Sequence, residues 1–258
     1  MSKRRQYVPG LKDRYRISRT KVDLFITCPH CFYLDVRLGI KRPPGFPFSL
    51  NSAVDTLLKA EFDQYRKVQL PHPYITKTGL NAVPYSHPKL DIWRNNFKGV
   101  SFVHEETGFE AFGAVDDLWI DLLTQEIIVV DYKATSKLNE VSLDADWQIG
   151  YKRQMEFYQW LLKKNGLNVA NQGWFVYCNG IKDKSAFNER LDFTVSMLPY
   201  VGNDSWVEPT LVEIKKCLDS GLIPLATEDC EYCQYALQYA TANGRTLLQE
   251  NTESFVLK

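Results

Sequence analysis

The feature that most constrains the fold is a run of β-branched residues, Ile127 to Val130, that leads directly into Asp131-Tyr132-Lys133. Such a run is typical of a strand that is buried on both faces. Side chains at positions i and i+2 of a strand project from the same face, so Asp131 and Lys133 are expected side by side, while Tyr132 points to the other face. The sequence therefore predicts a carboxylate and an ammonium held together at the end of a buried strand.

The segments around this strand predict an α/β fold, because helical and strand-like patterns alternate along the chain. The expected elements are helices from Ser18 to Thr27 and from Asn51 to Tyr65, loops over 67–108 with a short helix around Trp93, strands from Phe109 to Asp121 and from Glu126 to Lys133, a helix from about Asp146 to Asn165, strands from Gly173 to Asn179 and from Arg190 to Met197, and helices from Val207 to Ser220 and from Cys230 to Asn243. This order predicts a central mixed β-sheet flanked by helices.

Composition narrows the class of protein further. The chain has 258 residues, 45% of them hydrophobic, which is enough for one core with a small appended lobe. Its 31 basic residues balance its 31 acidic ones, which excludes a binder that works through overall positive charge but permits a local basic groove. We find no signal-peptide pattern and no window of ~18 apolar residues. We therefore expect a cytoplasmic protein without a membrane segment, whose cysteines bind metal or pack in the core.

A second carboxylate is predicted near Asp131. Asp116 ends the run Gly113-Ala114-Val115-Asp116 on the neighbouring strand, and Gly113 allows that strand to bend towards Asp131. Two converging carboxylates repel each other unless a divalent cation joins them, and hard oxygen ligands suit Mg²⁺ or Mn²⁺. Lys133 would then orient or activate a water molecule against a phosphodiester. A D-x-K tripeptide alone is weak support, since it is usually an ion pair.

The ordered set of motifs resembles the PD-(D/E)XK nuclease superfamily, in the branch of RecB-type nuclease domains and CRISPR-adaptation exonucleases. The motifs are G-x-x-D ending at Asp116, D-x-K from Asp131 to Lys133, and Q-x-x-x-Y from Gln154 to Tyr158. The segment from Ser18 to Gly39 is similar to the S-x-S…C-P-x-x-F-Y opening of many members. The likeness covers about residues 17–240.

The resemblance implies a restriction-endonuclease-like core and a function for each motif residue. Asp116 and Asp131 would be metal ligands, with the Tyr132 carbonyl as a further ligand. Lys133 would be the catalytic lysine, and Gln154 and Tyr158 would support the lysine or the substrate. Gln154 and Tyr158 are one helical turn apart, which places them on one face of the helix.

One position departs from the family pattern. Many members carry G-x-x-x-H on the helix before the sheet, where the histidine is a metal ligand. Here the corresponding stretch is Asn51-Ser52-Ala53-Val54-Asp55, so Asp55 stands where the histidine is expected. Aspartate can bind Mg²⁺, and two interpretations stay open, a further metal ligand or a surface acid.

Four cysteines form two C-x2-C pairs, Cys28 with Cys31 and Cys230 with Cys233. Pairs of this kind turn both thiolates towards one point, and four thiolates can hold either Zn²⁺ or a [4Fe–4S] cluster. Nuclease relatives with iron–sulfur clusters place one cysteine early and three late, whereas here the split is two and two. Because the count of four cysteines is the same, the resemblance to these relatives slightly favours a [4Fe–4S] cluster over Zn²⁺. The alternatives are a redox dithiol at Cys28 and Cys31, or four cysteines without a ligand.

From these features we expect one nuclease domain over 1–258, in which 18–40 and 222–243 together form a helical four-cysteine lobe and 67–108 is a loop-rich insertion. The expected activity is a Mg²⁺- or Mn²⁺-dependent deoxyribonuclease. It would act as an exonuclease on single-stranded DNA or DNA ends, in repair, recombination or CRISPR adaptation. A helicase, a CRISPR-type protein or a second copy would be its partner. The alternative is an inactive nucleic-acid-binding or scaffold protein on the same fold, stabilised by the four-cysteine metal site.

Overall fold

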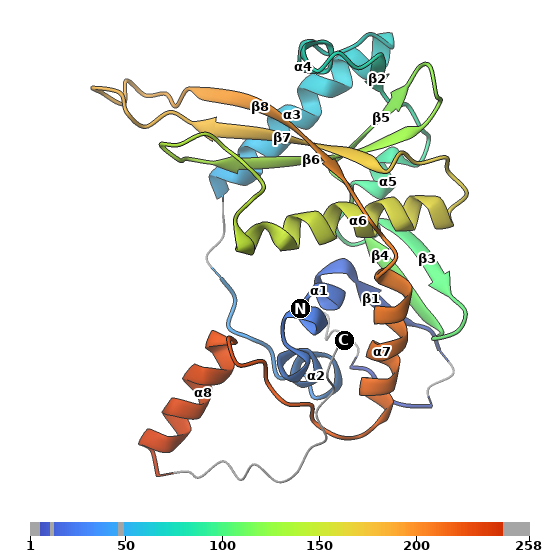
Figure 1. Cartoon of the computed structure of the whole chain (residues 1–258), viewed down its shortest axis with the longest axis vertical. Coiled ribbons are helices and arrows are strands. Elements are labelled where there is room, and N and C mark those ends of the chain that lie inside the picture. Colours follow the sequence, from blue (N-terminus) through green and yellow to red (C-terminus); the bar gives the residue numbers. More distant parts are fainter. Residues whose placement is uncertain (1–5, 11–12, 46–48, 245–258) are drawn as a thin grey trace. The chain divides into compact units, whose positions relative to one another are not determined.

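The computed structural model describes residues 6–10, 13–45 and 49–244, and it divides into two compact units (Figure 1). Of the described residues, the first unit comprises 6–10, 13–45, 103–111 and 205–244, and the second comprises 49–102 and 112–204. The chain passes from one unit to the other within strands β3 (Val100–His104) and β4 (Phe109–Gly113). These two strands form a three-stranded sheet with β1 (Tyr15–Ser18), in the order β1-β4-β3.

The second unit is built on a five-stranded sheet in the order β2-β5-β6-β7-β8. Strands β6 and β7 run parallel and the other neighbours run antiparallel, so the sheet is mixed. The elements of this unit are α3 (Ser49–Val68), α4 (Pro73–Lys77), β2 (Ala82–Pro84), α5 (Leu90–Trp93), β5 (Asp117–Asp121), β6 (Ile127–Thr135), a short 3₁₀ helix η1 (Asp146–Gln148), α6 (Ile149–Lys164), β7 (Gln172–Gly180) and β8 (Phe193–Val201).

Helices α3 and α6 cover opposite faces of this sheet (Figure 1). Leu58 and Phe62 of α3 pack against Ile128, Val130 and Tyr132 of β6. The alternate residues of β6 face α6, as expected from the two-residue period of a strand. The predicted α/β class, a central mixed sheet flanked by helices, is therefore confirmed.

A close approach of α6 to the sheet depends on Gly173 in β7. A Cβ atom at this position would collide with the Sδ atom of Met155 and lie 2.9 Å from the carbonyl oxygen of Val129. Only glycine leaves room for Met155, which is fully buried. This packing holds the α6 face of β6 close to the helix that carries Gln154 and Tyr158.

The turn between β5 and β6 follows from one aspartate. The Oδ1 atom of Asp121 accepts hydrogen bonds from the backbone N–H groups of Leu123 at 2.7 Å and Thr124 at 2.9 Å. An aspartate side chain that bonds to the backbone ahead of it favours a tight turn. The structure thus has a short turn between the strand expected to end at Asp121 and the strand expected to begin at Glu126.

The expectation of one continuous strand from Phe109 to Asp121 was wrong. Strand β4 ends at Gly113 and β5 begins at Asp117, and the two belong to different sheets. Between them the N–H of Val115 donates to the carbonyl of Trp93 at 3.1 Å, outside either ladder. Asp116 therefore lies at the entry to β5 rather than within a strand.

The stretch 67–108 contains α5 around Trp93, as expected, but also α4, β2 and all of β3. The sequence pattern missed β2 because it has three residues and ends at Pro84, which suits only the edge of a sheet. Strand β8 begins at Phe193 rather than Arg190. Its limits are set by pairing with β7, in which Gly180 faces Phe193.

The first unit is mainly helical. It contains α1 (Arg19–Thr27), α2 (Pro29–Arg37), α7 (Val207–Asp219) and α8 (Glu231–Ala242). Cys28 is extended, with φ of −159°, and separates α1 from α2, which begins at Pro29. Proline suits the first position of a helix, because its missing N–H would have no partner there. None of the helices in the described part of the chain has the length and apolar character needed to cross a membrane.

Candidate active site and cysteine cluster

Asp131 and Lys133 lie on the α6 face of β6, as the strand period predicts. The carboxylate of Asp131 has no exposed surface and its Oδ2 forms an ion pair with the Nζ of Lys133. Its Oδ1 accepts a hydrogen bond of 2.7 Å from the Nε2 of Gln154. The side chain of Lys133 is 13% exposed, whereas that of Asp131 is fully buried.

Gln154 connects the strand to the helix. Its Oε1 accepts from the Nζ of Lys133 at 3.5 Å, and its Nε2 lies 3.4 Å from the Oη of Tyr158. One amide therefore contacts both members of the D-x-K pair as well as the buried tyrosine one turn further along α6. The structure brings the D-x-K and Q-x-x-x-Y motifs together on this face.

Asp116 approaches the same group from the entry to β5. Its Oδ2 accepts a hydrogen bond of 3.0 Å from the backbone N–H of Tyr132, which fixes the carboxylate against β6. Its Oδ1 lies 3.5 Å from the Nζ of Lys59. The side chain of Tyr132 points to the opposite face, where its ring packs in the α3 core.

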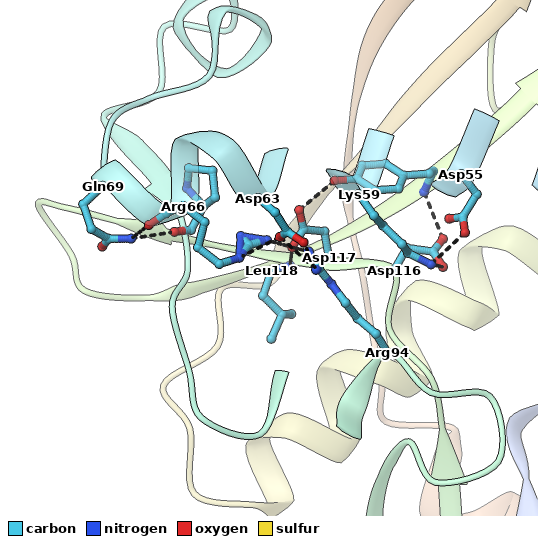
Figure 2. Close-up of polar contacts among 11 residues, drawn as sticks. Asp55, Lys59, Asp63, Arg66, Gln69, Arg94, Asp116, Asp117 and Leu118 are labelled. Atoms are coloured by element: carbon cyan, nitrogen blue, oxygen red, sulfur yellow. Dashed lines mark hydrogen bonds and ion pairs between the residues drawn. The ribbon is translucent and has the colours of Figure 1, made fainter. Parts of the chain in front are cut away.

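Helix α3 contributes Asp55 and Lys59, which are one turn apart. The Nζ of Lys59 lies 2.8 Å from the Oδ2 of Asp55, so Lys59 contacts both Asp55 and Asp116 (Figure 2). Sequence analysis identified Asp55 but missed Lys59. An acid and a lysine at i and i+4 usually form a surface pair, and nothing in the sequence indicates that Asp116 faces this helix.

The electrostatics of the site favour a bound cation. Burial raises the pKa of Asp131 to about 7, the negative charge of Asp116 acts in the same direction, and Lys133 opposes both. Burial and Asp116 also raise the pKa of Asp55. Asp131 thus needs either a proton or a nearby positive charge.

Carboxylate oxygens are hard donors, and three of these groups offer the ligand chemistry of Mg²⁺ and Mn²⁺. Asp116 acts electrostatically on both Asp55 and Asp131, so the three form one negatively charged group. Lys59 and Lys133 are interspersed among them. The residues present fit a divalent cation at Asp116 and Asp131.

A buried polar cluster that sequence analysis missed lies on the opposite face of β5 and β6 (Figure 2). Asp117 has no exposed surface and accepts hydrogen bonds from the Nη2 of Arg94 at 2.7 Å and the Oη of Tyr132 at 2.6 Å. Arg66 of α3 forms a further ion pair with it. The doublet Asp116-Asp117 was the available indication, because neighbouring strand residues face opposite ways and a buried acid requires partners.

The four predicted cysteines meet in the first unit. Their Sγ atoms all lie within 4.8 Å of one another, with separations of 3.8 Å for Cys28–Cys233, 3.7 Å for Cys31–Cys230 and 3.4 Å for Cys31–Cys233. All six cysteines of the chain are free, and Cys178 and Cys217 are buried elsewhere. Within the described residues this is the sole group of three or more His, Cys, Asp or Glu side chains with ligand atoms so close together.

Two features prepare the cluster for metal. Although burial acts in the other direction, hydrogen bonds from the backbone of Cys31 and Thr227 lower the pKa of Cys28 to about 6, which favours the thiolate that metals bind, whereas burial raises the pKa of Cys31 and of Cys233. The Nη2 of Arg42 lies 3.3 Å from the Sγ of Cys230 and supplies a positive charge. His30 lies between Cys28 and Cys31 in the sequence, but its ring contacts the carbonyl of Pro224 at 2.9 Å.

Comparisons with known proteins agree with this arrangement. A family model described as the PD-(D/E)XK nuclease superfamily matches residues 16–237, which contain every motif named above. No match is found among curated proteins. A solved structure described as "Crystal structure of SSO0001" is 16% identical, with a TM-score of 0.39, and the match covers 88% of this chain and 87% of that one. That likeness is too low to support an argument, but the family match spans most of the sequence. The chain belongs to the PD-(D/E)XK nuclease superfamily, a family of metal-dependent nucleases.

Proposed function

We propose that this protein is a Mg²⁺- or Mn²⁺-dependent deoxyribonuclease whose active site lies on the α6 face of β6. The observation that carries the proposal is the group formed by Asp131, Lys133 and Gln154, with Asp116 fixed against β6 through the N–H of Tyr132. Its chemistry is that of a phosphodiester hydrolase: carboxylates for a metal and an adjacent ammonium for a phosphate or a water molecule.

Asp116 and Asp131 would hold the metal, with the Tyr132 carbonyl as a further ligand, whereas Asp55, in the place of the usual histidine, would hold Lys59. A bound divalent ion supplies Lewis-acid stabilisation of charge on the phosphate and lowers the pKa of a bound water molecule. Metal binding would compete with protonation of Asp131, because burial raises the pKa of this carboxyl.

Lys133 would be the catalytic lysine. Its side chain is 13% exposed. Although burial acts to lower its pKa, Asp131 and Asp116 raise it and keep the ammonium charged. It can therefore donate a hydrogen bond to a phosphate oxygen or orient a water molecule. Gln154 would orient Lys133 and Asp131 together, and Tyr158 would hold Gln154 from the buried side.

An aromatic pair beside the lysine supports single-stranded DNA or DNA ends as the substrate. The Nζ of Lys133 lies 4.5 Å from the centre of the Tyr151 ring, and the Tyr151 and Trp147 rings pack edge to face with centroids 5.4 Å apart. Trp147 is 56% exposed, and the Nζ of Lys137 lies 5.1 Å from its ring centre. An exposed aromatic ring flanked by lysines can stack an unpaired base, whereas paired bases do not offer their faces.

The four-cysteine site would hold one zinc ion. Zinc binds sulfur at about 2.3 Å in a tetrahedron, which corresponds to separations of about 3.8 Å between sulfurs. Three pairs of sulfurs lie 3.4 to 3.8 Å apart and all four sulfurs lie within 4.8 Å of one another, which is close to that size. A [4Fe–4S] cluster is larger than a single ion and holds its thiolates further apart. Spacing thus favours zinc over the iron–sulfur cluster that the resemblance favours.

The alternative is an inactive nucleic-acid-binding or scaffold protein on the same fold. The observation that favours it is Asp55 in the histidine position, already paired with Lys59. Against it stand Asp131 and Lys133, which burial and Gln154 hold in contact, because a binding protein has no need of a buried carboxylate–lysine pair. A role in repair, recombination or CRISPR adaptation, with a helicase or CRISPR-type partner, stays a prediction.

The deciding experiment measures cleavage of end-labelled single- and double-stranded DNA by the full chain with Mg²⁺ or Mn²⁺. Lys133→Ala is the test variant. Lys216→Ala is the control, since Lys216 is an exposed lysine of α7 paired with Glu213. We expect metal-dependent cleavage of single strands that Lys133→Ala abolishes and Lys216→Ala retains. The product ladder will separate exonuclease from endonuclease action.

Two results would contradict the proposal. Cleavage by Lys133→Ala at the wild-type rate would show that the site is assigned wrongly. A folded wild-type protein that binds DNA but does not cut it with either metal would favour the binding protein.

A further inference from the structure

Lys59 is a charged group of the site that no family motif explains. Its Nζ lies 2.8 Å from the Oδ2 of Asp55 and 3.5 Å from the Oδ1 of Asp116. The side chain is 22% exposed, so water screens this contact only partly. Figure 2 shows that the lysine extends from α3 to the carboxylates of both residues.

The position of Lys59 follows from the helix rather than from chance placement of a long side chain. Asp55 and Lys59 are separated by one turn of α3 and share a face. Leu58 and Phe62 of the same helix are buried in the core against β6, which fixes the rotation of α3. The rotation of α3 therefore places the backbone of Lys59 on the side of the helix from which its side chain reaches Asp116.

The charges of the site set a limit on how many cations it accepts. Three carboxylates, at Asp55, Asp116 and Asp131, face two ammoniums, at Lys59 and Lys133. One divalent ion therefore changes the formal charge of the group from minus one to plus one, and a second would raise it to plus three. Charges that close together repel strongly when water is partly excluded.

We propose that Lys59 acts as a fixed cation that takes the place of a second divalent ion beside Asp116, so that the active site binds a single metal ion. This inference rests on the proposed function, which puts that ion at Asp116 and Asp131. Asp55 is then the anchor of Lys59, and its carboxylate holds a second ion only when the ammonium is removed. Asp55 in the histidine position and Lys59 one turn later then act as a unit, because the carboxylate of Asp55 holds the ammonium of Lys59.

The experiment counts Mn²⁺ ions bound per full-length protein without DNA, by calorimetry and by electron paramagnetic resonance. The variants are Lys59→Met, which keeps the length of the side chain without its charge, Lys59→Arg, which keeps the charge, and the double variant Lys59→Met with Asp55→Asn. We expect one ion for wild type and for Lys59→Arg. We expect two for Lys59→Met, and one again for the double variant, because Asp55→Asn removes the carboxylate that holds the second ion.

One ion in Lys59→Met, or two in the wild type, would overturn the inference. Circular dichroism will check folding, and Lys59→Gln will replace Lys59→Met if the methionine variant does not fold. A different result would overturn the proposed function itself: no Mn²⁺ bound by the wild type, or Mn²⁺ bound equally well by Asp131→Asn. These results are distinguishable, because the first concerns the number of ions and the second concerns whether Asp131 holds any.

Discussion

The hydroxyl of Tyr132 offers a direct test of how the active-site strands are held together. It donates a 2.6 Å hydrogen bond to the Oδ2 of Asp117, and both side chains are buried, at 6% and 0% exposed. The backbone N–H of the same tyrosine bonds to Asp116 on the opposite face. Tyr132→Phe removes the hydroxyl while keeping this N–H and the ring, whose centroid lies 5.7 Å from that of Phe62.

The expected loss follows from the partners that Asp117 retains. A hydrogen bond to a charged group contributes about 1.5–3 kcal/mol to the free energy of unfolding. Removing the donor costs more when the buried acceptor is left without other donors. Asp117 keeps Arg66, Arg94 and its own neighbour, the N–H of Leu118 at 2.7 Å. We therefore expect Tyr132→Phe to lower the free energy of unfolding by about 2 kcal/mol, in the lower half of that range.

Urea unfolding followed by circular dichroism, with thermal melts, will measure the change. A loss of about 2 kcal/mol corresponds to a fall in Tm of about 4–8 °C for a chain of this size. The control is Tyr74→Phe, because Tyr74 is half-buried against the same core. It should change stability by less than about 0.5 kcal/mol. If Tyr132→Phe lost no more than this control, the Asp117 cluster would not stabilise the strands as argued.

Three further predictions follow from the two sites. In the metal-free folded protein the pKa of Asp131 is about 7, against an ordinary value of 3.8. The folded state therefore holds this proton more tightly than the unfolded state, so the protonated carboxyl adds stability below pH 3.8, and that stability is lost as the pH rises through 7. In urea unfolding, the free energy of unfolding of Asp131→Asn relative to the wild type should therefore rise as the pH rises over that range. A difference that does not change with pH would contradict the burial argument. Elemental analysis of the purified protein should find zinc and no iron. Removal of the cysteine-bound metal should lower the Tm, and an unchanged Tm would refute a structural metal. In the Lys133→Ala background, Trp147→Ala should weaken the binding of single-stranded DNA roughly tenfold, as measured by fluorescence anisotropy. Binding of duplex DNA is the control. Equal weakening of single-stranded and duplex binding would exclude base stacking.

The amino-acid sequence by itself determined the features that depend on local periodicity. The β-branched run from Ile127 to Val130 and the two-residue period placed Asp131 and Lys133 on one face, and the helical period placed Gln154 and Tyr158 together. The two C-x2-C pairs likewise identified the thiolate cluster, because each pair closes within one turn of chain. These features are predictable, since strand and helix geometry is the same in any fold.

The tertiary structure decided everything that depends on which segments become neighbours. It broke the expected strand before Asp117, gave Lys59 a second partner in Asp116, and surrounded Asp117 with arginines from α3 and from the residue after α5. It also brought the two C-x2-C pairs, which are about 200 residues apart in the chain, within 4.8 Å of one another. No local pattern encodes these contacts, because they join residues far apart in the chain through the register of β5 on β6 and the rotation of α3 on its core.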